Sequence, residues 1–130
     1  MLSLPRIIKF KILCTILFWC LPLLVFSPAW FSRVGLPIPE PMVLIRLLGA
    51  AYLSLTVGYV LGLRELQHGR PATQTVRIGI FSNGLACAIL IYYGLTGTWS
   101  TWSIQGQFIM WSSVILTLFI TVSLIPYRNN

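Results

Sequence analysis

Four long apolar stretches fill most of this 130-residue chain, and they restrict its possible folds more than any other feature. They cover about residues 7–26, 42–63, 76–95 and 108–125. Each is close to the roughly 20 residues that a helix needs to cross a bilayer. Because lipid cannot hydrogen-bond the backbone, such stretches favour helices. The sequence therefore predicts an all-α integral membrane protein, with residues 1–130 forming a single domain, a four-span up-down-up-down bundle.

The composition argues against a soluble domain. Apolar residues make up 57% of the chain and charged residues only 8%, whereas a soluble domain averages about 25% charged. In a soluble protein, the net charge of +7 would suggest nucleic acid. Here the basic residues lie beside apolar stretches, where they contact lipid headgroups and set topology. We therefore expect the lipid bilayer as a partner and no nucleic acid.

The positive charges gather at one set of ends of the apolar stretches. Seven lie on the side of the two termini and the middle loop: Arg6, Lys9, Lys11, Arg64, Arg70, Arg77 and Arg128. The opposite side has only Arg33, with Arg46 just inside the second stretch. The positive-inside rule then predicts a multi-pass protein of the cell inner (cytoplasmic) membrane, with both termini in the cytoplasm.

Small residues recur every four positions along the second stretch, at Ala50, Ser54, Gly58 and Gly62. Such a stripe lets another helix approach closely, which matters because lipid gives helices no hydrophobic reason to associate. We expect these residues to form a helix-packing face, against either another span of this chain or another subunit. Replacing Gly58 with Leu is then expected to disrupt that packing.

Arg46 lies about five residues into the second stretch, roughly 7 Å below its start. It has two interpretations. The side chain could extend outward to the interface and pair with Glu40 or a lipid phosphate. Alternatively, it could point inward and bind an anionic or polar group, together with aromatic residues at a similar depth, Tyr92, Tyr93 and Trp111. The direction of Arg46 discriminates between them.

Asn83 is the other polar residue deep within a span. Its amide needs hydrogen-bond partners in hydrocarbon, so we interpret it, like Glu40, as a structural polar residue. Thr121 and Tyr59 are at suitable depths to bond to it from neighbouring spans.

No catalytic or metal-binding signature is present. The chain lacks the HExxH, GxSxG, Walker A and GxGxxG patterns. Its three cysteines lie inside apolar stretches without a CxxC pair. The sequence thus predicts no catalytic residue, no metal site and no cofactor, and favours a protein that is not an enzyme.

The start of the second stretch, Arg46-Leu47-Leu48-Gly49-Ala50-Ala51-Tyr52-Leu53, follows a proline-bearing loop. This segment and the four-span plan resemble the DoxX-like group of small four-helix bacterial membrane proteins. Some members of that group resemble accessory subunits of quinone-linked oxidoreductases. The resemblance carries no catalytic residue over to this chain.

Two functional hypotheses follow. The first is a non-enzymatic accessory or structural subunit of a larger membrane complex, or a homo-oligomer, which the small-residue stripe and short loops favour. The second is a four-helix membrane bundle that binds a lipid, a quinone or a small solute through Arg46 and the nearby aromatic residues.

Overall fold

The computed structural model describes residues 3–37 and 41–129, and these residues form helices and connections without a strand. The helices are α1 (Leu4–Thr15), η1 (Ile16–Cys20), α2 (Leu21–Val25), α3 (Pro28–Arg33), α4 (Val43–Gln67), α5 (Thr73–Leu95), α6 (Ile104–Leu124) and η2 (Ile125–Tyr127). Four helical segments are long and apolar enough to cross a membrane, namely Leu4–Val25, Val43–Gln67, Thr73–Leu95 and Ile104–Tyr127. The prediction of four long apolar helices is therefore confirmed.

Several helices extend beyond their apolar stretches. The second continues beyond its apolar residues, through Arg64 to Gln67, because polar residues such as these can also adopt a helical conformation. It ends where Gly69 adopts a φ of +72° and the N–H of Arg70 bonds back to the carbonyl of Glu65. The fourth begins at Ile104, because the Ser103 hydroxyl accepts a hydrogen bond from the N–H of Gly106.

The first span changes its helical pitch in the middle. Residues Ile16–Cys20 form a π-helix, and the N–H of Leu21 bonds to the carbonyl of Ile16. Pro22 follows directly. Its ring cannot donate a hydrogen bond and would clash with the preceding turn of a regular α-helix. A wider turn relieves that clash, which accounts for a π segment just before Pro22.

The prolines in the loop after the first span disfavour a long regular helix there. The structure contains a short one, α3, which begins at Pro28, where the missing N–H costs nothing. It is brief because Gly35 adopts a φ of +72° soon after its end.

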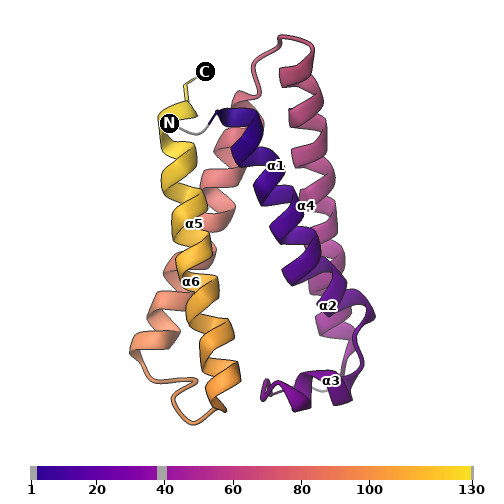
Figure 1. Cartoon of the computed structure of the whole chain (residues 1–130), viewed down its shortest axis with the longest axis vertical. Coiled ribbons are helices and arrows are strands. Elements are labelled where there is room, and N and C mark those ends of the chain that lie inside the picture. Colours follow the sequence, from indigo (N-terminus) through magenta and orange to yellow (C-terminus); the bar gives the residue numbers. More distant parts are fainter. Residues whose placement is uncertain (1–2, 38–40, 130) are drawn as a thin grey trace.

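The spans associate as two pairs (Figure 1). The first span packs along α4, and α5 packs extensively along α6. Both termini and the connection between α4 and α5 lie at one end, called here the terminal end. The opposite end, called the α3 end, holds α3 and the connection between α5 and α6.

The pairs meet in an apolar core near the terminal end. Its buried residues come from all four spans: Leu4, Ile7, Ile8, Tyr59, Val76, Ile120 and Leu124. Gly79 of α5 lies at the closest approach. A Cβ atom there would lie 2.8 Å from Leu124 Cδ1, 3.7 Å from Tyr59 Cε1 and 4.0 Å from Lys11 Cε. A glycine at this position lets the four spans converge.

Candidate functional site

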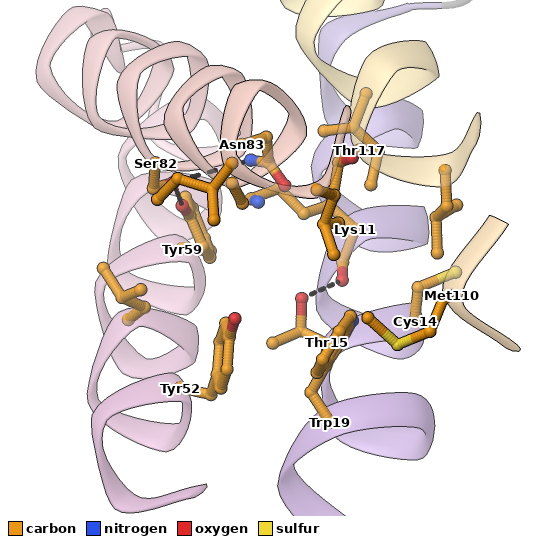
Figure 2. A pocket seen from close by; sticks show the side chains of 16 residues that line it. Lys11, Cys14, Thr15, Trp19, Tyr52, Tyr59, Ser82, Asn83, Met110 and Thr117 are labelled. Carbon is orange, nitrogen blue, oxygen red and sulfur yellow. Dashed lines mark hydrogen bonds between the residues drawn. The ribbon is translucent and has the colours of Figure 1, made fainter. Parts of the chain in front are cut away.

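A cavity of about 300 Å³ lies between the four spans, next to the apolar core. Figure 2 shows side chains from several helices pointing toward it. Its polar lining residues are Lys11, Cys14, Thr15, Ser82, Asn83 and Thr117. Since these residues belong to apolar helices, a polar cavity wall at this depth is the feature that most requires an explanation.

Lys11 is the only charged residue that lines this cavity, and only 4% of it is exposed. It is the eighth residue of the first span, about 10 Å along the helix axis from Leu4. Its Nζ atom lies 4.3 Å from the centroid of the Tyr59 ring, a cation–π contact. Among residues 3–37 and 41–129, this cation–π contact is the interaction that the amine makes, and the hydrogen bond at Lys11 involves its backbone carbonyl, which accepts from Thr15.

Hydrogen bonds fix the other polar groups on the terminal side of the cavity. The hydroxyls of Tyr59 and Ser82 lie 3.0 Å apart and join α4 to α5. Asn83 donates through Nδ2 to the carbonyl of Gly79, at 2.6 Å. Asn83 is buried, but its bonds stay within its own helix, so the expected bond across to Tyr59 or Thr121 is not formed. Ser82 is the partner that Tyr59 uses instead.

Aromatic and aliphatic side chains line the rest of the cavity. Trp19, on the π segment, stacks on Tyr52 of α4 with ring centroids 5.2 Å apart. Further apolar lining comes from Leu55, Ala86, Ile89, Leu90, Met110, Leu116 and Ile120. The cavity thus has a polar side around Lys11 and Asn83, and an apolar side that extends toward the α3 end (Figure 2).

The hydrogen bonds of Arg46 differ from both interpretations of the sequence. Its Nη1 donates to the carbonyl of Leu23, and its Nη2 donates to the carbonyl of Phe26, both at 2.8 Å. These carbonyls lie at the end of α2, where a helix has no internal donors left. The guanidinium therefore caps α2 and ties the first span to the second, with a positive charge at the negative end of a helix.

The other members of the predicted Arg46 site lie elsewhere. Tyr92 is 63% exposed and packs edge-on against Tyr93, with ring centroids 5.3 Å apart. Trp111 packs against Trp99, with centroids 5.8 Å apart. None of these residues lines the central cavity. Glu40, the expected partner of Arg46, lies outside the described residues.

The small-residue stripe divides into two parts. Gly62 is buried against Thr75 of α5, so it is a packing position within this chain. Ala50, Ser54 and Gly58 are exposed, and a Cβ atom at Gly58 would meet no atom within 4 Å. The face of α4 that packs inward carries Gly49, Thr56 and Tyr59 instead. For the three exposed residues, packing against another subunit stays a prediction.

The sequence contains a signal for the inward position of Lys11 that the distribution of charge along the chain does not reveal. Lys9 and Lys11 are two residues apart, so they point to nearly opposite sides of a helix, and both cannot lie on its exposed side. Lys11 is three or four residues from Ile7, Ile8, Cys14 and Thr15, all of which are buried. Lys9 is exposed, as a headgroup anchor should be, while Lys11 is not.

Metal chemistry has no support in the part of the chain that the structure describes. Within it, no group of three His, Cys, Asp or Glu side chains could hold a metal ion. The three cysteines are free and buried.

Comparison with protein-family models, curated proteins and solved structures found no match. The resemblance to the DoxX-like group therefore stays a prediction.

Proposed function

We propose that this chain is a four-span membrane protein that binds a small amphipathic molecule in its central cavity. The observation that carries the proposal is the cavity itself, with a polar side around Lys11 and apolar walls toward the α3 end. Its volume of about 300 Å³ is at the lower end of the range for small-molecule sites. A mostly apolar wall with a few convergent polar groups is the usual composition of such sites.

The proposal places the bundle in the cytoplasmic membrane with an up-down-up-down path and the terminal end in the cytoplasm. Exposed cations at the terminal end support this orientation: Arg6, Lys9, Arg64, Arg70, Arg77 and Arg128. On the other side, Arg33, the last residue of α3, is the exposed cation among the described residues. Even without the buried Lys11, the terminal end carries many more exposed positive charges than the α3 end.

A second candidate function rests on a different observation. Ala50, Ser54 and Gly58 leave a slim, exposed strip on α4 that no other span of this chain covers. Such a strip suits the close approach of a helix from a partner protein, as in an accessory subunit. The cavity and the strip involve different faces of α4, so the two functions are compatible.

The test is purification of a tagged protein from its native membrane in mild detergent, followed by mass spectrometry of everything that remains bound. Binding in the cavity predicts a specific small amphipathic molecule at close to one per chain. A stoichiometric protein partner with no bound small molecule would instead favour the accessory role. Only bulk phospholipid, in the proportions of the membrane, would contradict the binding proposal.

A further inference from the structure

We propose that the molecule bound in the central cavity is an anionic amphiphile, whose carboxylate or phosphate pairs with Lys11. This inference rests on the proposed function and adds the chemical class of the ligand. The described residues supply a buried amine that faces a cavity, with no oxygen in hydrogen-bond contact. An anionic headgroup would supply the missing acceptor.

The chain offers few internal partners for a buried cation. It contains two acidic residues, Glu40 and Glu65. Glu65 lies at the terminal end of α4, where its carboxylate is paired with the guanidinium of Arg70 at 2.6 Å. Glu40 lies outside the described residues. A charge that is buried in apolar surroundings is retained where something pairs with it.

The ring of Tyr59 does not replace such a partner. A cation–π contact stabilises the charge through the face of the ring but accepts no ordinary hydrogen bond from the ammonium. The Tyr59 hydroxyl is engaged with Ser82, at 3.0 Å. The hydroxyl of Thr15 donates to the carbonyl of Lys11 itself, at 2.8 Å. The N–H donors of Lys11 are therefore available to a ligand.

The arrangement of the lining also indicates how the ligand lies. Lys11 and Asn83 are on the terminal side of the cavity, whereas Trp19, Tyr52 and Met110 are on the side toward the α3 end (Figure 2). An amphiphile with its anionic group at Lys11 would place its apolar tail along the aromatic and aliphatic wall. A small inorganic anion would leave that wall unused, so the lining favours an amphiphile.

The experiment measures binding of dodecanoate, its neutral methyl ester and dodecyl phosphate by native mass spectrometry of the full chain released from non-ionic detergent. The variants are Lys11→Met and, as a matched control with the same loss of charge, the exposed Lys9→Met. We expect the wild type and Lys9→Met to bind at least one anionic probe about tenfold more tightly than the ester, because a charge-assisted hydrogen bond is lost with the ester. Lys11→Met should bind all three alike.

The relative affinities of the two anionic probes distinguish the source of the anion. Preference for dodecanoate indicates a fatty-acid carboxylate, and preference for dodecyl phosphate indicates a phospholipid headgroup; both support the inference. Equal binding of the ester and the anions by the wild type would overturn it while leaving the proposed function intact. The melting temperature verifies that Lys11→Met is folded, and Lys11→Gln replaces it if it is not. A folded variant that still prefers the anionic probes to the ester would overturn the role of Lys11. Binding of none of the probes would contradict both proposals.

Discussion

At the scale of single residues, two cations inside the spans have opposite surroundings. The guanidinium of Arg46 is bonded to two backbone carbonyls, while the side-chain amine of Lys11 has no hydrogen-bonded partner among the described residues. The first arrangement stabilises the fold, because it satisfies carbonyls at the end of α2. The side-chain amine of Lys11, in contrast, is available to bind a ligand. Removing each charge should therefore affect different properties of the protein.

Arg46→Gln should lower the thermal stability of the protein in detergent. Two hydrogen bonds from a charged donor are lost, each contributing about 1.5–3 kcal/mol. The expected destabilisation is thus about 3 kcal/mol or more. Arg33→Gln is the matched control, because Arg33 is exposed in the last turn of α3. Equal melting temperatures for the two variants would refute the capping role of Arg46.

At the scale of elements, helix packing depends on which glycines meet another helix. Gly79 lies where α5 approaches α1, α4 and α6, whereas Gly58 faces open space on α4. Both occur in long helices, so a substitution at either has a similar intrinsic effect on the helix. The difference between them isolates the contribution of interhelical contact.

Gly79→Ala should lower the melting temperature, because the new methyl group would lie 2.8 Å from Leu124 Cδ1 and the Leu124 side chain, which is fully buried, has little room to shift. The expected cost is about 1–3 kcal/mol. Gly58→Ala should leave the monomer unchanged or slightly more stable, since alanine favours a helix. Of the two partners expected for Gly58, another span of this chain does not meet it in the structure, and packing against another subunit stays a prediction. A large loss of stability in Gly58→Ala would instead show that a partner covers this strip.

The elements themselves could be predicted from sequence, while the site could not. Long apolar runs favour helices in lipid whatever their exact residues, so the four long apolar helices could be predicted from the sequence. The bonds of Arg46 could not be predicted, because its acceptors are backbone carbonyls that every residue possesses. The cavity depends on which helix faces meet, and α4 packs through Gly49, Thr56, Tyr59 and Gly62, whereas Ala50, Ser54 and Gly58 of its small-residue stripe are exposed. Lys11 was grouped with Arg6 and Lys9 because they are close in sequence, although it points to another face.

At the scale of the whole molecule, the two helix pairs meet in a core near the terminal end, and a partly open cavity lies between them beside this core. The proposed topology then places α3 and the connection between α5 and α6 outside the cell. The three native cysteines are buried, so they provide a low background for chemical labelling.

Thr101→Cys should react with a membrane-impermeant maleimide on intact cells, because Thr101 is exposed in the connection between α5 and α6. Gln67→Cys, at the exposed end of α4, should react only after the membrane is permeabilised. The unmodified chain is the control for reaction at native cysteines. The reverse pattern of labelling would contradict the proposed orientation.

Occupancy of the central cavity tests the account most directly. Ala86 lines this cavity, whereas Ala88 on the same helix is exposed and outside its lining. The measurement is native mass spectrometry of the wild type, Ala86→Phe and Ala88→Phe, purified identically from the native membrane. We predict a bound small amphipathic molecule in the wild type and in Ala88→Phe, and its loss from Ala86→Phe, because the phenyl ring fills the space. Retention of the same molecule by a folded Ala86→Phe variant would contradict the assignment of the cavity as the binding site.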